Sequence, residues 1–321
     1  MSDNKEVIIK AVNVSKSFDL GKGIKLKANN SINLDIYKGE TLGIVGESGC
    51  GKSTFIRMIL QMESPTEGRI LFKGKDLSEL KGEKKRQSRK HIQMVFQDPD
   101  GSFNPKMTIK KIICESLLNY GEINSSQVDE KAEELLKMVE LPAEFKDRYP
   151  FQFSGGQRQR VGIARSLAID PEVLVLDEAT SALDVSVQKS IVDLLLRLQK
   201  EKNITIIFVC HDIALIRSMS HRIIIMYLGN VVEIVPSCRL GQEFAHPYTR
   251  ALIDSIFSLD MDFSKKIESI ESEIPSPLHV PSGCPFRNRC DQCMRICEEE
   301  KPDYYEVEEG HMIACHKFKN K

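Results

Sequence analysis

The chain has 321 residues, of which 41% are hydrophobic, so it is long enough for two or three domains with ordinary cores. Its 45 Lys and Arg residues nearly balance its 46 Asp and Glu residues, which excludes a global positive field that would attract nucleic acid or an anionic membrane. No apolar run approaches the roughly 20 residues that span a bilayer, and residues 1–10 are polar rather than a signal peptide. These features predict a globular protein that is made and kept in the cytoplasm.

The N-terminal part of the chain predicts a small β-rich lobe that leads into a phosphate-binding unit. Short β-type runs at residues 8–14 and 32–36 are separated by turn residues. A brief apolar strand at residues 41–45 is followed at once by a glycine-rich loop, and residues 53–61 have helical character. Strand, loop and helix therefore follow one another in the order that a phosphate-binding loop requires.

The glycine-rich loop matches the pattern G-x-x-x-x-G-K-[ST]. Its glycines let backbone N–H groups turn inward around phosphate oxygens, where a side chain would block the approach. We predict that Lys52 neutralises the β- and γ-phosphates of ATP and that Ser53 offers its hydroxyl to Mg²⁺, while the next helix points its positive end at the anion. The alternative is a chance glycine turn. The nucleotide-binding residues expected here are Gly46, Glu47, Ser48, Gly49, Cys50, Gly51, Lys52, Ser53 and Thr54.

Cys50 lies inside this loop, near Lys52 and the start of a helix. Such an environment lowers the pKa of a thiol and makes it more nucleophilic. The sequence therefore predicts that alkylating agents inactivate the protein at Cys50.

The middle of the chain predicts a parallel α/β sheet with a helical insertion. Short, continuous runs rich in β-branched residues, typical of strands covered on both faces, occur at residues 91–96, 173–176 and 204–209. Helical patterns at residues 129–139 and 157–169 separate the first two runs. A hairpin is expected at residues 222–235, with its turn at Gly229–Asn230.

Six basic residues lie between Lys81 and Lys90, with no aromatic residue among them. A nucleic-acid groove is one interpretation of this run. We favour a solvated loop before the strand at residues 91–96.

The strand at residues 173–176 ends in two adjacent carboxylates, Asp177 and Glu178. Two charges at the tip of an apolar strand need a cationic partner, which Mg²⁺ would supply. We expect Asp177 to hold the metal through water and Glu178 to orient and deprotonate the attacking water. Acidic residues also cap strands for purely structural reasons, so this assignment depends on the glycine loop upstream.

A second phosphate-type feature is the capped, glycine-bearing start of a helix at Ser154, Gly155, Gly156 and Gln157. The alternative is an ordinary capped helix. One chain thus offers two phosphate-type sites but only one complete nucleotide loop.

A series of motifs in this chain closely resembles the ATPase subunits of ABC transporters, over roughly residues 7–255. In chain order, the motifs are the loop at residues 46–54, Gln97, residues 153–157, Asp177–Glu178, residues 181–184 and His211. The resemblance implies an α/β fold of the P-loop NTPase class, of the ABC ATPase type. Its parts are a RecA-like parallel-sheet core, an N-terminal antiparallel β lobe, a helical subdomain and a small Cys-rich C-terminal extension. The implied domains are a nucleotide-binding domain at residues 1–257, with the helical subdomain inserted at about 99–170, and a linker with the extension at 258–321.

The same resemblance assigns further roles. Phe18 would stack on adenine, and Gln97 would sense Mg²⁺ and relay to the membrane subunit, completing a Mg²⁺ set with Ser53 and Asp177. His211 would contact the γ-phosphate and act in catalysis with Lys52 and Glu178, although a lone His after a strand is more often structural. In a head-to-tail dimer, residues 154–157 would close on ATP bound by the partner's loop, with Asp184 at the dimer seam.

Three segments resemble one branch of this family in particular, the oligopeptide and dipeptide importer ATPases. They are residues 98–109, residues 149–160 and the cysteine-rich tail. In that family the tail carries cysteines spaced C-x5-C-x6-C with a fourth further on, which Cys284, Cys290, Cys297 and Cys315 match, and some members hold an iron–sulfur cluster there. Four thiolates suit a [4Fe–4S] cluster, which we favour, or tetrahedral zinc. Cys293 can substitute for a neighbour, and free thiols remain the alternative.

The implied function is ATP hydrolysis that energises the import of oligopeptides or dipeptides. The implied partners are two transmembrane permease subunits, a second ATPase subunit that is a copy or a paralogue, and an extracytoplasmic substrate-binding protein, with no nucleic acid. The implied location is the cytoplasmic face of the cell membrane. Alternatives are an importer for nickel or another small solute, an exporter subunit, and a soluble ABC-type ATPase that acts on nucleic acid.

Overall fold

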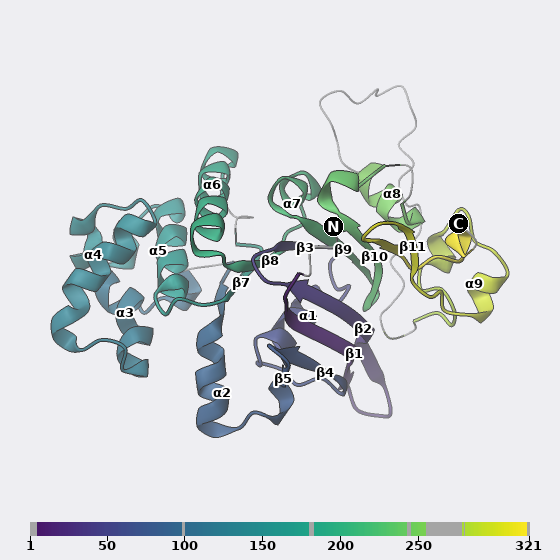
Figure 1. Ribbon diagram of the computed structural model, residues 1–321, viewed down its shortest axis with the longest axis horizontal. Coiled ribbons are helices and arrows are strands. Elements are labelled where there is room, and N and C mark those ends of the chain that lie inside the picture. The colour runs from purple at the N-terminus through teal and green to yellow at the C-terminus, as the bar shows by residue number, and fades with distance from the viewer. Residues whose placement is uncertain are drawn as a thin grey trace. The chain divides into compact units, whose positions relative to one another are not determined.

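The structure is a computed structural model (Figure 1), and it describes residues 5–97, 100–179, 183–242, 245–254, 278 and 280–319. The chain divides into two compact units. Unit 1 comprises Met1–Glu6, Tyr37–Thr41 and Glu79–Cys210, and unit 2 comprises Val7–Ile36, Leu42–Ser78 and His211–Lys321.

Unit 1 contains a parallel sheet in the order β8-β7-β6. Its strands are β6 (Ile92–Val95), β7 (Val173–Asp177) and β8 (Thr205–Val209). All of β8 and the first four residues of β7 are buried, as expected of β-branched and aliphatic strands that helices cover on both faces. The three predicted strands of this region are confirmed to within one residue at each end.

The helices of unit 1 include a bundle in which α3, α4 and α5 pack on one another, and Figure 1 shows these three lying side by side. The bounds are α2 (Gly82–Ser88), α3 (Ile109–Tyr120), α4 (Val128–Met138), α5 (Gly155–Leu167) and α6 (Val185–Lys202). Their apolar faces meet through fully buried side chains such as Ile113, Leu136 and Val161. The bundle is the helical subdomain that the sequence predicts.

One prediction is wrong at α2, because the basic segment at residues 81–90 was expected to form a loop. Residues with good helix propensity dominate it, and the Glu83 carboxylate accepts two hydrogen bonds from Arg86 one turn later, at 2.7 and 2.8 Å. Every α2 side chain is exposed or half-buried, so the segment is solvated as predicted but helical.

Unit 2 holds two sheets. An antiparallel sheet has the order β2-β1-β4-β5, and a second set of strands has the order β11-β12-β10-β9-β3. The strands are β1 (Val7–Asp19), β2 (Lys25–Tyr37), β3 (Thr41–Val45), β4 (Glu67–Phe72), β5 (Lys75–Asp76), β9 (Arg222–Tyr227), β10 (Asn230–Pro236), β11 (Tyr305–Glu308) and β12 (His311–Ile313). The helices are α1 (Lys52–Ile59), α7 (Ile213–Met219), α8 (Pro247–Asp254) and α9 (Ile296–Glu299).

The antiparallel β lobe and the strand before the glycine loop are confirmed. Strands β3 and β9 run parallel, with Leu42 opposite Arg222 and Val45 opposite Ile225. The other pairs in unit 2 for which a register is defined are antiparallel.

The hairpin between β9 and β10 is present, but its turn lies one residue earlier than predicted. Tyr227 pairs with Asn230, and the two turn residues are Leu228 and Gly229, with φ of 42° and 75°. Asn230 is buried and donates its side-chain amide to the Leu228 carbonyl at 2.7 Å. This hydrogen bond draws Asn230 into the strand and leaves the left-handed conformation to Leu228.

The cysteine-rich segment forms regular structure that its composition does not predict. Strand β12 pairs with β10, with Glu233 opposite Ile313, and β11 pairs with β12. Phe286 packs edge-on against Tyr227, with ring centroids 5.2 Å apart. The extension therefore shares the core of unit 2. Residues 258–277, most of the predicted linker, lie outside the described residues.

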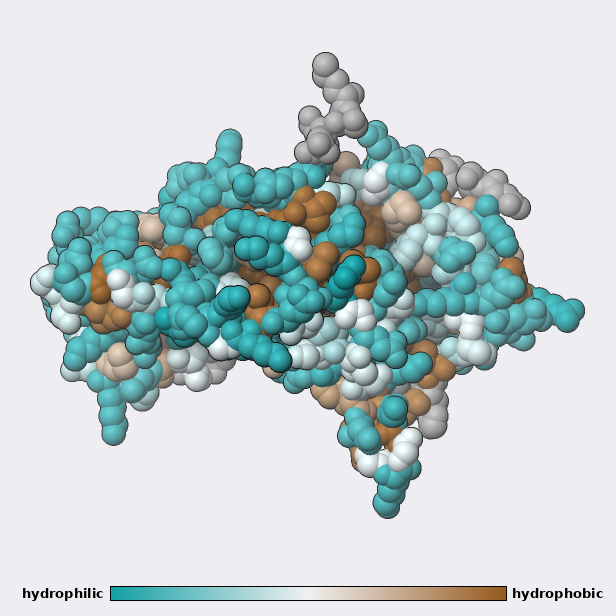
Figure 2. All heavy atoms as spheres, turned by 60° about the horizontal axis from the view of Figure 1, so that its bottom comes forward, coloured by the Kyte–Doolittle hydropathy of each residue, from teal (hydrophilic) through white to brown (hydrophobic). Residues whose placement is uncertain are grey.

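In the face that Figure 2 presents, hydrophilic side chains predominate, and hydrophobic ones form smaller groups among them. No helix in the described ranges combines the length and apolar character that crossing a bilayer demands.

Candidate functional site

The glycine loop joins the end of β3 to the start of α1, and its backbone requires glycine at two positions. Gly51 precedes α1 with φ of 104°, and a Cβ there would lie 2.2 Å from the Ala28 carbonyl oxygen. At Gly46, with φ of 156°, a Cβ would lie 2.2 Å from the Met226 carbonyl oxygen. Any side chain at either position would clash with backbone. The loop is therefore held close to two other segments of unit 2.

Lys52 is 5% exposed, and its ammonium group lies within the loop. Its Nζ donates to the carbonyl oxygens of Gly46, at 2.6 Å, and Glu47, at 3.0 Å. These contacts keep a positive charge inside the loop whose backbone N–H groups are predicted to bind phosphate. Ser53 is exposed and Thr54 half-buried in the first turn of α1.

Cys50 does not match its prediction. The thiol is 3% exposed, and burial raises its pKa above the ordinary value, although the nearby Lys52 acts in the opposite direction. The desolvation cost of a thiolate outweighs the attraction of the ammonium group. Cys50 is therefore a packed loop residue rather than an activated nucleophile.

Glu47 connects the loop to a part of the chain that no motif includes. Its carboxylate accepts two hydrogen bonds from the guanidinium of Arg289, at 2.8 and 3.0 Å. Its backbone N–H donates to the Tyr248 hydroxyl at 2.9 Å. Arg289 belongs to the C-terminal extension and Tyr248 to α8. Two segments that are distant in sequence therefore contact the loop.

Two other predicted nucleotide contacts belong to unit 2. Phe18 lies in β1, half-buried, with Lys16 Nζ 5.0 Å from the centre of its ring, and this aromatic face is of the kind that stacks on a base. His211 is exposed, one residue before the Asp212 carboxylate that caps α7 by accepting from the Leu215 N–H at 3.0 Å.

In unit 1, the predicted carboxylates lie at the end of β7. Asp177 is the last residue of the strand, opposite Val209 of β8. Glu178 has φ of 51°, and its N–H donates to the Val209 carbonyl at 3.0 Å. A left-handed conformation is uncommon for a non-glycine residue and marks a position held by its surroundings. Gln97 follows β6 and is exposed.

The start of α5 is a complete capping box. The Ser154 hydroxyl accepts from the Gln157 N–H at 3.4 Å, and Gln157 Oε1 accepts from the Ser154 N–H at 3.0 Å. A Cβ on Gly156 would lie 2.4 Å from Val187 Cγ1, on α6. Gly156 therefore lets α5 pack against the first turn of α6.

Asp184 caps α6, because its Oδ1 accepts from the Val187 N–H at 3.0 Å and from the Ser186 hydroxyl at 2.7 Å. The hydrogen bond from Val187 chiefly lowers the pKa of this carboxyl group, and Ser186 adds to the effect. Asp184 therefore lies at the start of the helix whose first turn packs against Gly156. Residues 180–182, which include the preceding Ser181 and Ala182, lie outside the described residues.

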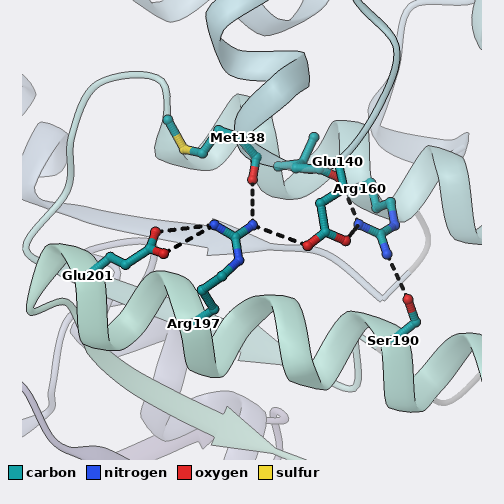
Figure 3. Close-up of polar contacts among 7 residues, drawn as sticks. Met138, Glu140, Arg160, Ser190, Arg197 and Glu201 are labelled. Carbon is teal, nitrogen blue, oxygen red and sulfur yellow. Dashed lines mark hydrogen bonds and ion pairs between the residues drawn. The ribbon is translucent and has the colours of Figure 1, made fainter.

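A polar network fixes α5 to α6 and to the end of α4 (Figure 3). Arg160 donates to the Val139 carbonyl at 2.7 Å, to Glu140 at 2.8 Å and to the Ser190 hydroxyl at 2.7 Å. Arg197 reaches the same Glu140 carboxylate from α6 at 3.3 Å. The helix that follows Ser154 is therefore held by the charged contacts of Arg160, between one and two turns beyond its N-terminus.

The four tail cysteines of the predicted metal site lie in one region of unit 2. Cys284 donates its N–H to the Cys297 carbonyl at 2.8 Å. The pKa of the Cys284 thiol is raised to about 12, chiefly by burial and in smaller part by the nearby thiols of Cys297, Cys315 and Cys290. However, no three His, Cys, Asp or Glu side chains converge closely enough to hold a metal ion within the ranges that the structure covers.

Sequence patterns did not identify three residues that lie next to the glycine loop or to its contacts, namely Arg289, Tyr248 and Tyr227. Tyr227 stacks at a tilt on Tyr248, with centroids 4.7 Å apart, and its hydroxyl lies 3.5 Å from Arg289. No local pattern links residue 289 to residue 47, because the pairing depends on the tertiary fold. The one sequence clue is position, since Arg289 immediately precedes Cys290.

Comparison with known proteins identifies two family models in the chain. Residues 29–181 match the ABC transporter model, and residues 232–297 match the C-terminal region of oligopeptide/dipeptide transporters. The chain is 46% identical over 310 residues to the putative oligopeptide transport ATP-binding protein YkfD of Bacillus subtilis (strain 168), covering 94% of this chain and 93% of that protein. It is 44% identical to the oligopeptide transport ATP-binding protein AppF of the same organism, covering 98% of each.

Among solved structures, the fold is similar to a dimeric structure of a post-hydrolysis state of the ATP-binding cassette MJ0796 bound to ADP and Pi. The TM-score is 0.65 and the sequence identity 34%, over 71% of this chain and 98% of that one. The similarity supports the predicted ABC ATPase fold.

Proposed function

The chain belongs to the ABC transporter family of ATP-binding subunits, and on that basis we propose that it hydrolyses ATP to energise import of oligopeptides. The observation that carries the proposal is the loop between β3 and α1, where Gly46 and Gly51 allow the close backbone approach and Lys52 supplies the charge. The C-terminal region of oligopeptide/dipeptide transporter type and the names of the relatives support peptides as the cargo.

The roles of the site residues follow from charge and position. Lys52 neutralises the β- and γ-phosphates, and the backbone N–H groups at the start of α1 cradle them. Ser53, Gln97 and Asp177 would hold Mg²⁺, which would supply positive charge to the phosphate groups during transfer. Glu178, one residue past β7, takes the proton of the attacking water, and His211 contacts the γ-phosphate.

The adenine is held by Phe18 in this proposal. The remaining nucleotide contacts come from a second ATPase subunit, either a copy or a paralogue. Ser154, Gly155, Gly156 and Gln157 present a capped helix start to the partner's ATP, and Asp184 lies at the dimer seam. Exposed apolar side chains support a partner surface here, since Phe151 is 74% exposed and Val185 is 81% exposed.

The assembly that we propose contains two transmembrane permease subunits, with the ATPase pair attached at the cytoplasmic face of the membrane. An extracytoplasmic substrate-binding protein delivers the peptide. The chain binds no nucleic acid in this scheme. An importer of nickel or another small solute is the second candidate, because in this scheme the other subunits select the cargo.

The experiment that tests the proposed function is ATP hydrolysis by the purified protein, alone and with its permeases, compared with the Glu178→Gln variant. We expect the variant to bind ATP but to lose roughly a hundredfold or more in turnover, because general base catalysis contributes on the order of 10²–10⁴-fold. Wild-type turnover in the variant would exclude Glu178 as the base. Peptide uptake into vesicles that contain the whole complex, with nickel uptake measured in parallel, identifies the cargo.

We also propose that Cys284, Cys290, Cys297 and Cys315 bind a [4Fe–4S] cluster, or zinc as the alternative. Two observations support this proposal: the spacing of the four cysteines, and the electrostatic interaction by which the other three thiols raise the pKa of Cys284. In the described part of the chain, however, the side chains do not converge into a group that could hold a metal ion. Iron, sulfide and zinc analysis of protein purified without oxygen tests it, and a metal-free product that remains folded and active contradicts it.

A further inference from the structure

We propose that Arg289 of the C-terminal extension is a positioning residue for the phosphate loop, and that through Glu47 it sets the affinity for ATP. The inference rests on the proposed function, because it assigns to the extension an effect on that same ATP site. Its basis is the two-pronged ion pair between Arg289 and Glu47, which joins residues 242 positions apart within unit 2.

Glu47 is placed to transmit this contact to the phosphates. Its carbonyl oxygen accepts from Lys52 Nζ at 3.0 Å and from the Cys50 N–H at 3.3 Å. Its own N–H is directed to the Tyr248 hydroxyl. A movement of the Glu47 carboxylate therefore turns the peptide that orients Lys52, so loss of the ion pair changes the geometry of the residue that neutralises phosphate.

Arg289 is committed to this contact by its burial. Its side chain is 4% exposed and that of Glu47 is 19% exposed, and the guanidinium lies 5.7 Å from the centre of the Tyr227 ring. The Nε of Arg289 is buried without a hydrogen-bond partner in the part of the chain that the structure describes. A buried guanidinium is stabilised only by the pairing that its other nitrogens make. Here both donate to the Glu47 carboxylate, and one of them also donates to the Tyr227 hydroxyl at the longer distance of 3.5 Å.

The neighbouring residues show how the extension holds the arginine. Arg289 ends a short 3-10 turn, Arg287–Arg289, and its N–H donates to the Phe286 carbonyl at 3.0 Å. Phe286 is 2% exposed and packs against Tyr227 and Tyr248. The aromatic core thus places the turn, the turn places Arg289, and Arg289 places Glu47. Coupling of this kind is reciprocal, so ATP in the loop also stabilises the docked extension.

Steady-state hydrolysis of Mg·ATP tests the proposal with the full chain. In Arg289→Met we expect KM for ATP to rise about tenfold, within the range typical of coupling between sites, with kcat changed by less than about twofold. Arg289→Lys keeps the charge but cannot form the two-pronged pair, so it should restore only part of the affinity. Arg295→Met is the matched control, because this arginine of the extension has a side chain that is 92% exposed, and its KM should equal that of the wild type.

A double-mutant cycle separates positioning through Glu47 from general loosening of the extension. If the ion pair is the route, Arg289→Met adds little to the KM increase caused by Glu47→Gln, because the interaction is already lost. Additive increases, or an unchanged KM in both Arg289 variants, would overturn the inference. If Arg289→Met does not fold, the same cycle is measured with Arg289→Lys in its place, and the same two outcomes support or overturn the inference. A wild-type protein without ATPase activity refutes the proposed function instead.

Discussion

Cys50 illustrates how burial decides the chemistry of a single residue. Its neighbours in sequence, a lysine and a helix start, are those that activate thiols elsewhere. In the folded chain the thiol is almost inaccessible, at 3% exposure, and a Cβ on Gly46 would lie only 2.7 Å from its sulfur. Desolvation therefore raises the pKa despite Lys52, whose Nζ lies 3.8 Å from the sulfur. The local pattern indicates the charge nearby but not the loss of water.

We therefore expect Cys50 to resist alkylation in the native protein at pH 7. Iodoacetamide should label the exposed Cys238 at least about tenfold faster than Cys50, because only the accessible thiolate reacts. Mass spectrometry of tryptic peptides after timed labelling measures both rates. The control is the same reaction in urea, where the two rates should converge. Equal rates in the native protein would restore the original hypothesis of an activated Cys50.

At the scale of elements, the packing of α5 on α6 matters because α5 begins at Ser154. Gly156 permits the close approach, and the network of Arg160, Arg197 and Glu140 supplies polar contacts further along (Figure 3). The two arginines differ in burial, since Arg160 is 13% exposed and Arg197 39%. The more buried arginine also satisfies the Val139 carbonyl and Ser190.

We predict that Arg160→Met lowers the free energy of unfolding by about 2 kcal/mol, because it removes the charge-assisted hydrogen bonds of a guanidinium group that is itself largely shielded from water. Arg197→Met should cost less than about 1 kcal/mol, since its ion pairs are exposed and screened. Urea unfolding of both variants, followed by circular dichroism, measures the difference. Equal losses would mean that burial does not separate the two arginines.

The elements that sequence patterns predicted correctly are those whose cause is local. The runs that became β7 and β8 are buried on both faces and show it in their composition, and Gly46 and Gly51 of the loop lie where φ is 156° and 104°. The errors have tertiary causes. Leu228 takes the left-handed turn because Asn230 is drawn into β10, and β12 forms because β10 offers it a partner some 80 residues earlier in the chain.

At the scale of unit 2, the extension is joined to the rest by a buried polar cluster. Glu233 of β10 is fully buried, and its carboxylate accepts from the His246 N–H at 2.8 Å and contacts His311 Nε2 at 2.8 Å. Thr249 also donates to this carboxylate. One side chain therefore joins β10, β12 and the start of α8, and its partners His246, Thr249 and His311 are each 1% exposed.

His246 gives this cluster a testable pH dependence. Burial lowers its pKa to about 4, although Glu233 nearby acts in the opposite direction, whereas the unfolded chain has the ordinary value of about 6.5. Between these values the unfolded state binds the extra proton, so stability is complete above pH 6.5 and is lost as the pH falls toward 4. Between pH 7 and pH 5 this group alone should lower the free energy of unfolding by about 2 kcal/mol. The Tyr248 N–H donates to His246 Nδ1 at 3.1 Å. In His246→Asn the amide oxygen can accept this hydrogen bond, and the loss over the same pH interval should be smaller by that amount. Urea titrations of both proteins at the two pH values give the four free energies, and identical losses would show that His246 does not carry the effect.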